Sequence, residues 1–354
     1  MNKKLYLESG YLNFEYIFKM SEKHNAPYIF IIGGRGIGKT YGALKYLLDN
    51  EIKFMFMRRT QSQLDTIKKD ELSPFKKLNA DTGRNISFFP ISKYNSSINN
   101  AIQNENGKLI PDGDYLGMAC ALSTISNLRG FDASDIDVLL YDEFIPERHE
   151  KTLKNESDAL FNSLETIGRN RELNGYRPLK LLALANSNNL SNEIFISLGL
   201  VNIVDKMQKS GNEIKFLDSR NIMLVNIQSS PISGFKLKST LANLTAGTSF
   251  SDMAYHNNYI GVIHDCIRSE DLRQYRIVIS LGELQIYKHK SQLKYYVCDH
   301  LSGVPKRIYT TSVNSLREFR AKERDIWNNY ILNRMSFETY SQQVLFEKYN
   351  RLAR

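Results

Sequence analysis

Residues 33–40 read Gly33-Gly34-Arg35-Gly36-Ile37-Gly38-Lys39-Thr40, which matches the pattern G-x-x-x-x-G-K-[ST]. Glycines permit a tight turn whose backbone N–H groups point at phosphate oxygens. In this pattern the lysine reaches the β- and γ-phosphates of a nucleotide, and the final hydroxyl binds Mg²⁺. The eight residues therefore predict a binding loop for ATP and Mg²⁺, with Lys39 and Thr40 as the main side-chain contacts.

The flanking residues suit such a loop. The apolar run 28–32 precedes it and is typical of a buried parallel strand, and a helical pattern follows from about Thr40 to Asp49. The positive end of that helix would point at the phosphates. A glycine-rich turn without a ligand is the alternative. The dinucleotide pattern G-x-G-x-x-G is excluded, because no glycine register between residues 33 and 42 satisfies it.

Further apolar runs end in polar side chains. They cover residues 53–57 before Arg58 and Arg59, 138–141 before Asp142 and Glu143, 180–185 before Asn186, and 221–227. Strands that alternate with helical patterns predict an α/β fold with a parallel sheet. Ligands of such sheets bind beyond the carboxyl ends of the strands, so these polar residues are expected at one active edge.

The acidic pair after the run 138–141 indicates hydrolysis. Asp142 is expected to hold Mg²⁺, directly or through water, and Glu143 to polarise the attacking water. A nucleotide kinase needs no water activation, so the second carboxylate argues against that alternative. Together with the phosphate loop, the pair predicts a P-loop ATPase of the additional-strand (ASCE) class.

Three more residues are candidates for catalysis. Arg169 follows a helical segment, where it either reaches the γ-phosphate of a neighbouring subunit or caps its own helix. Arg129 is a second candidate for a trans-acting residue. Asn186 either hydrogen-bonds the attacking water or serves as a turn residue.

Composition and charge limit the class of protein. The chain has 354 residues, 42% of them hydrophobic and 24% charged, which suits globular domains and not a disordered chain. The net charge is +9, and residues 258–354 carry +6 of it, which favours a polyanionic partner. Arg58, Arg59, Lys68 and Lys69 lie either on a loop that faces DNA or on a solvated helix face.

The sequence also predicts a location and a division into domains. No apolar stretch reaches the roughly 18 residues that span a bilayer, no signal peptide is recognisable, and the three widely spaced cysteines favour a reducing compartment. We expect an ATPase domain over 1–228, a linker over 229–257 and a small β-rich domain over 258–354. Strand-like runs at 275–282, 284–289, 295–298 and 307–311 and a helical pattern from about Val313 support the last.

The motifs together resemble the DNA-packaging (encapsidation) ATPases of phi-29-like tailed bacteriophages, which are relatives of the large terminase subunits. The matching pieces are residues 30–41, 56–59, 141–145, 159–172 and 184–187. Order and spacing agree over about residues 28–190 and more loosely beyond. The resemblance implies a homopentameric ring at a portal vertex that translocates double-stranded DNA into a prohead. It makes Arg169 the leading arginine finger, Arg129 a trans-acting residue and Asn186 a sensor.

The resemblance also implies partners and a place of action. These are double-stranded DNA, the portal or connector, and in some relatives a packaging RNA, with no membrane. The motor would act in the host cytoplasm, docked transiently on the prohead, and be absent from the mature virion.

In related terminases the second domain is an RNase H-like nuclease whose acids hold two metals. Here the run 276–282 carries no acid, and Asp265, Glu283 and Asp299 are isolated in sequence, so we expect a vestigial domain without nuclease activity. A terminase with a live nuclease and a non-motor nucleotide-binding scaffold of the prohead are the alternatives.

Overall fold

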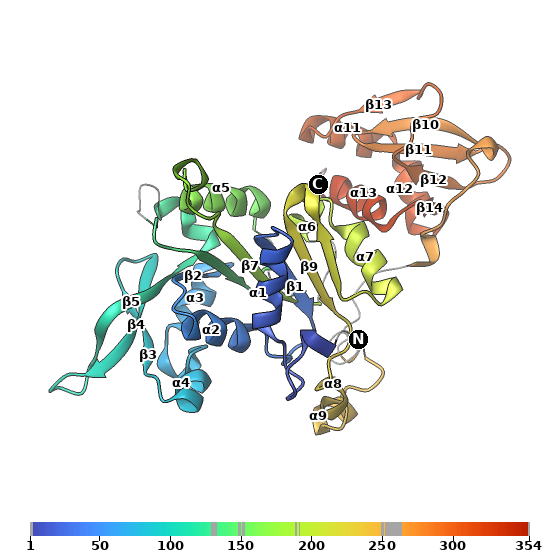
Figure 1. The fold of residues 1–354 in the computed structure, drawn as a ribbon. Coiled ribbons are helices and arrows are strands. Elements are labelled where there is room, and N and C mark those ends of the chain that lie inside the picture. The colour runs from blue at the N-terminus through green and yellow to red at the C-terminus, as the bar shows by residue number, and fades with distance from the viewer. Residues whose placement is uncertain are drawn as a thin grey trace. The chain divides into compact units, whose positions relative to one another are not determined.

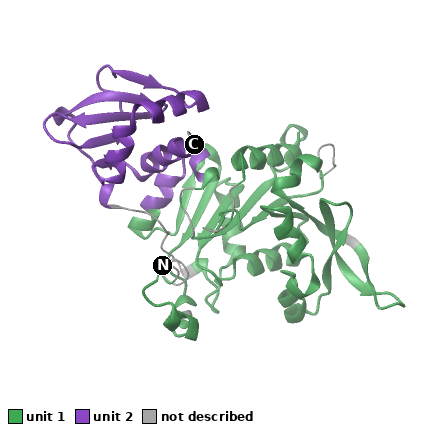
Figure 2. Cartoon of the chain, turned by 180° about the vertical axis from the view of Figure 1, so that it is seen from behind, with its two compact units in different colours: residues 1–194, 207–260 green, residues 195–206, 261–354 purple. Residues whose placement is uncertain are grey.

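The structure is a computed structural model, and it describes residues 3–128, 133–147, 150, 153–187, 190, 192–248, 251 and 264–352. The chain divides into two compact units, which Figure 2 distinguishes by colour. The first unit comprises Met1–Ile194 and Met207–Ile260, and the second comprises Phe195–Lys206 and Gly261–Arg354. Residues 195–206 therefore group with the second unit, although they lie within the stretch expected to form the ATPase domain.

The first unit contains a nine-stranded sheet in the order β3-β4-β5-β2-β6-β7-β1-β9-β8 (Figure 1). Its six neighbouring strands from β5 to β9 are all parallel. The predicted parallel strands are confirmed as β1 (Tyr28–Gly33), β2 (Phe54–Arg58), β6 (Val138–Asp142), β7 (Lys180–Asn186) and β9 (Ile222–Ile227). Since they are parallel, their carboxyl ends share one edge of the sheet, as expected.

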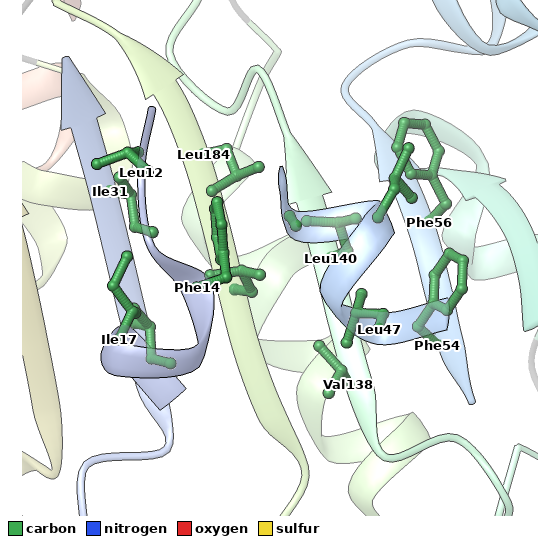
Figure 3. Packing of buried hydrophobic residues seen from close by; sticks show 14 of the residues in the cluster. Leu12, Phe14, Ile17, Ile31, Leu47, Phe54, Phe56, Val138, Leu140 and Leu184 are labelled. Atoms are coloured by element: carbon green, nitrogen blue, oxygen red, sulfur yellow. The ribbon is translucent and has the colours of Figure 1, made fainter. Parts of the chain in front are cut away.

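Helices cover both faces of this parallel sheet. On one face, side chains of α1 (Phe14–Lys23) and α2 (Lys39–Asp49) pack on alternate residues of the strands, such as Ile31, Phe56 and Leu140 (Figure 3). On the other face lies α5 (Glu156–Gly168), whose Glu156 accepts a hydrogen bond from Tyr141 of β6. Fully burying one large apolar side chain stabilises a fold by about 1.5–3 kcal/mol, so these two layers hold the loop-bearing strand β1 in place.

An antiparallel extension was missed by the sequence analysis. It consists of β3 (Ile86–Pro90), β4 (Asn95–Gln103) and the first part of β5 (Leu109–Ala121), and Figure 1 shows the β4–β5 hairpin projecting from the sheet. Strand β4 is rich in Asn and Ser, a composition that is typical of a loop. It pairs because β5 supplies its backbone partners. A further edge strand, β8 (Ile214–Leu217), pairs with β9 in antiparallel fashion and was also missed.

The remaining helices of the first unit and of the segment 195–206 are short. They are α3 (Gln61–Ile67), α4 (Lys76–Thr82), α6 (Glu193–Ser197), α7 (Val201–Ser210), α8 (Ser233–Lys236) and α9 (Thr240–Leu244).

The second unit contains a mixed five-stranded sheet in the order β13-β10-β11-β12-β14. The four predicted strand runs are confirmed, as β10 (Tyr275–Leu281), β11 (Leu284–His289), β12 (Tyr295–Cys298) and β13 (Arg307–Tyr309); β14 (Met335–Phe337) was missed. The helices α11 (Val313–Lys322), α12 (Arg324–Ile331) and α13 (Tyr340–Leu352) follow, as the helical pattern predicted. Leu281, Val297, Phe319 and Phe346 contribute to a separate core between sheet and helices.

Candidate nucleotide site

The glycine loop connects β1 to α2 and takes a shape that side chains would obstruct. Gly36 and Gly38 have φ values of 66° and 86°, in the left-handed region that favours glycine. A Cβ atom at Gly38 would lie 2.9 Å from the Tyr11 ring. Gly38 is the residue before α2 and has no side chain to cap it, so the first backbone N–H groups of the helix are available to an anion.

Lys39 is held at the floor of the site. Its Nζ donates hydrogen bonds to the carbonyl oxygens of Gly33 (2.9 Å) and Gly34 (2.7 Å) and to Oδ1 of Asn186 (3.0 Å). Asn186 lies beside Gly33 because β7 and β1 are paired in register. The predicted loop lysine and the predicted sensor are therefore in direct contact.

Thr40 and Asp142 also meet. The Thr40 hydroxyl donates to Asp142 Oδ1 over 2.9 Å, although the two residues are 102 positions apart. Burial raises the pKa of the Asp142 carboxyl above its ordinary value, while Arg58, Thr40 and Lys39 oppose that rise.

The surroundings of the second carboxylate oxygen of Asp142 indicate a position for a cation. Asp142 Oδ2 is buried and has no hydrogen-bond partner within the described part of the chain. The guanidinium of Arg58 lies 3.4 Å away, within ion-pair distance. A hydroxyl and a carboxylate oxygen left without a hydrogen bond form a donor set suited to Mg²⁺, which prefers oxygen ligands.

Glu143 stands at the open side of the site. It adopts a φ of 58°, which is uncommon for a residue with a side chain, and its side chain is 50% exposed. Its carboxylate forms an ion pair with Arg58, whose side chain is only 11% exposed. Arg58 thus contacts both members of the acidic pair, which confirms its expected place at the active edge, although the sequence analysis gave it no role there.

The predicted solvent or DNA exposure of Arg58 and Arg59 is wrong. Arg59 is fully buried, where its Nε donates to Glu156 Oε1 at 2.7 Å and its Nη1 lies 3.3 Å from Glu150 Oε2. Tyr141 donates to the same Glu156 oxygen. Arg58 pairs with the acidic pair and Arg59 pairs with Glu150 and Glu156, so neither arginine lies on an exposed loop.

A cavity of about 360 Å³ lies between the phosphate loop, the acidic pair and Asn186. Arg35 of the loop pairs with Glu147 at its rim. Its lining comprises Arg35, Gly36, Gly38, Lys39, Thr40, Tyr41, Asp142, Glu143, Glu147, Ala185 and Asn186.

Arg169 does not lie at this cavity. It is the C-cap of α5, and two residues later Arg171 binds the backbone oxygens of Ser134 and Ile136 just before β6 begins. Arg169 therefore lies at the edge of the sheet where the parallel strands begin, while the phosphate loop lies at the edge where they end. The seven residues of β7 span about 20 Å at ~3.3 Å per residue, which is more than an arginine side chain can reach. Arg129 lies outside the described residues.

The model of the family "Podovirus DNA encapsidation protein (Gp16)" matches residues 18–350, nearly the whole chain. The chain belongs to this family of podovirus encapsidation proteins. The resemblance inferred from the motifs is thereby confirmed, and the family match extends it well past residue 190.

Individual relatives agree with this membership. A "DNA packaging protein" of Bacillus phage PZA is 26% identical over 315 residues, which cover 87% of this chain and 85% of that protein. The solved phi-29 viral genome packaging motor assembly contains a chain that is 17% identical, with a TM-score of 0.65 over 98% of this chain and 100% of the other. The phi-28 gp11 DNA packaging motor gives 20% identity and a TM-score of 0.60, over 95% and 96%. At these identities the structures support a shared fold.

No helix among the residues that the structure describes combines the length and the apolarity needed to cross a membrane.

Proposed function

We propose that this encapsidation-family chain is the ATP-hydrolysing subunit of a motor that moves double-stranded viral DNA into a prohead. The observation that carries the proposal is the contact between Thr40 and Asp142, which joins the phosphate loop to the acidic pair in one site. Family membership supports the packaging role, as does the name of the PZA relative.

The chemistry follows from the positions of the side chains. The backbone of residues 33–38 and the start of α2 would bind the phosphates, with Arg35 at the rim. Lys39 would exchange its bonds to the loop carbonyls for phosphate oxygens, because its ammonium group already stands at the floor of the cavity. Glu143, exposed at the open side, would accept the proton of the attacking water. Asn186, bonded to Lys39, would report the state of the phosphates to β7.

Thr40 and Asp142 would hold Mg²⁺ through the hydroxyl and the Asp142 oxygen that has no hydrogen bond within the described part of the chain. The ion, when bound, neutralises charge that develops on the β- and γ-phosphates.

The topology supports the additional-strand class of P-loop ATPases. Strand β7 lies between β1, which ends in the phosphate loop, and β6, which ends in the acidic pair. The added strand carries Asn186 to the site, which a direct β1–β6 pairing would not do.

The remote position of Arg169 supports a role in trans. Because its own loop lies at the other edge of the sheet, Arg169 could serve only a neighbouring copy, as in a ring. We propose a homopentamer from the family resemblance. Arg129 stays a second trans-acting candidate.

The second unit is proposed as a vestigial RNase H-like domain. Strand β10 contains no acid, and the residues that the structure describes include no group of three or more His, Cys, Asp or Glu side chains able to hold a metal ion. Asp265, Glu283 and Asp299 belong to no such group among the described residues, and we propose a domain without nuclease activity in preference to a terminase with a live nuclease.

The remaining proposals concern organisation and partners. The ATPase domain would cover 1–228, the linker 229–257 and the nuclease-like domain 258–354. The motor would dock on the portal of the prohead, with or without a packaging RNA, in the host cytoplasm, and leave before the virion matures.

The test is ATP hydrolysis by the purified chain with and without double-stranded DNA, with Glu143→Gln as the blank. DNA-stimulated hydrolysis that disappears in the variant supports the motor. A chain that binds ATP but does not hydrolyse it, even with proheads and DNA, supports the alternative of a nucleotide-binding scaffold.

A further inference from the structure

The cavity at the phosphate loop is bordered by one aromatic ring. Tyr41, the residue after Thr40, is the one aromatic side chain among the described residues that line the cavity. It lies in the first turn of α2 and packs in part on the apolar core. Its hydroxyl donates to Asp81 Oδ2 of α4 over 2.9 Å. Because the ring is held at its far end by this bond, Tyr41 offers an aromatic surface that is already oriented.

The loop determines the direction in which a nucleotide must lie. In this loop pattern the backbone holds the α- and β-phosphates, and the lysine reaches the β- and γ-phosphates. Lys39 Nζ is bonded to Asn186 at the end of β7, and Glu143 borders the same cavity at the end of β6. The γ-phosphate therefore belongs near β6 and β7. The nucleoside must leave the phosphates at the other end, over the first turn of α2.

One side of that first turn is closed. Gly38 and Gly42 are four residues apart, so they share a face of the turn. A Cβ atom at Gly38 would lie 2.9 Å from the Tyr11 ring, and one at Gly42 would lie 2.8 Å from the Phe14 ring. The N-terminal segment thus fills the space on this face. Tyr41 lies on a different face of the turn, so the nucleoside passes on the Tyr41 side.

We propose that the base of the bound nucleotide stacks on the ring of Tyr41, which Asp81 holds in position. The proposal rests on the proposed nucleotide site and names the side chain that recognises the nucleoside half of the substrate. Stacking uses the π face that every base carries, and a purine buries more ring surface than a pyrimidine. Tyr41 is therefore a specificity-determining residue that favours purine nucleotides, and Asp81 is a positioning residue.

The test compares ATP with inorganic tripolyphosphate, which carries the phosphates without a base. Binding to the full chain is measured with Mg²⁺ by isothermal titration calorimetry. Tyr41→Ala should raise the Kd for ATP by roughly 5–150-fold, the range for loss of one base–aromatic stack, and leave the Kd for tripolyphosphate within about twofold. The loss should be smaller for UTP than for ATP. Tyr41→Phe should recover most of the affinity for ATP, because it keeps the ring.

The matched control is Tyr115→Ala. The hydroxyl of Tyr115 also donates to an aspartate, Asp135, but this pair lies beside Lys53 at the edge where β2 and β6 begin. Tyr115→Ala should change neither Kd. Equal losses of ATP and tripolyphosphate affinity in Tyr41→Ala, or equal losses of ATP affinity in Tyr41→Ala and Tyr115→Ala, would overturn the stack and leave the nucleotide site standing. An unmodified chain that binds neither ligand would overturn the nucleotide site itself.

The role of Asp81 is tested through Tyr41. Asp81→Ala should weaken ATP binding less than Tyr41→Ala does and leave tripolyphosphate binding unchanged. The double variant should lose no more ATP affinity than Tyr41→Ala alone, since Asp81 acts only on the ring. Additive losses would contradict the positioning role.

Tyr41→Trp gives a direct readout of the contact. A base that stacks on an indole quenches its fluorescence, so ATP should quench the added signal and tripolyphosphate should not. Tyr115→Trp should respond to neither ligand, and the one native tryptophan, Trp327, gives both variants the same background. Quenching by tripolyphosphate equal to that by ATP would show that no base lies on this ring.

Discussion

Arg58 and Glu143 form an ion pair across the ends of two neighbouring strands, β2 and β6. The same guanidinium lies 3.4 Å from Asp142, so one largely buried cation pairs with both carboxylates of the acidic pair. An Arg58 side chain that is 11% exposed is costly to hold away from water unless it is paired. It therefore restrains the carboxylate that is proposed to activate water.

Arg58→Ala should slow ATP turnover more than it weakens ATP binding. Without the guanidinium, Glu143 samples positions that do not face the water, and a general base contributes about 10²–10⁴-fold to rate. We expect a fall in kcat on the order of 10–100-fold, with ATP affinity within about threefold, measured by steady-state kinetics and equilibrium binding. Arg58→Lys should recover part of the rate, and unchanged kcat in Arg58→Ala would contradict the role.

Lys39→Ala should reduce nucleotide affinity. A hydrogen bond to a charged group contributes about 1.5–3 kcal/mol, so Kd for ATP should rise by roughly 10–150-fold in a fluorescence titration. Lys45→Ala on the same helix is the control, because Lys45 is exposed and pairs only with Asp49 among the interactions described. Equal affinities in the two variants would refute the nucleotide site.

Arg169→Ala should abolish hydrolysis and be rescued by a partner. An arginine finger contributes on the order of 10³-fold or more to rate. Lys39→Ala and Arg169→Ala chains are each expected to be inactive, but their mixture should recover activity, since the first supplies Arg169 to the intact loop of the second. The ATPase rate across mixing ratios measures this, and mixtures as inactive as the separate variants would exclude action in trans.

Arg59→Met should destabilise the first unit. The substitution leaves Glu156, 3% exposed, as a buried carboxylate without its guanidinium, which costs about 3–5 kcal/mol. Urea unfolding followed by far-UV circular dichroism measures the loss, and Arg59→Met with Glu156→Met should recover part of it. Arg84→Met, which removes the more exposed pair with Asp49, should cost no more than about 1 kcal/mol. A similar loss in both single variants would argue against a buried network.

The full chain should not cut DNA. With Mn²⁺ or Mg²⁺, supercoiled plasmid is expected to stay intact on an agarose gel, because β10 lacks an acid and the described residues contain no metal-binding cluster. Nicking that is lost in Glu283→Gln would restore the live-nuclease alternative.

Sequence by itself determined the phosphate loop, the parallel strands around it and the family. The loop depends on glycines and a lysine that act locally, and continuous apolar runs are long enough to mark buried strands without knowledge of their neighbours. The acidic pair could be placed near the loop for the same reason, since parallel strands end at one edge. The β4 strand escaped detection because its Asn and Ser residues pair through backbone bonds that no side-chain pattern reveals.

Only the tertiary structure decided the roles of Arg58 and Arg59. Successive residues at a strand end point to opposite faces, so one arginine reaches Asp142 and Glu143 while the next turns beneath the sheet to Glu156. The two arginines are the same residue type at adjacent positions, so the sequence does not distinguish them. Their different partners are carboxylates 84–97 positions away in the chain. Likewise, Arg169 could be recognised as a helix-end arginine, but its separation from its own phosphate loop follows from α5 running back along the sheet. Those assignments depend on long-range packing, which residue patterns along the chain do not encode.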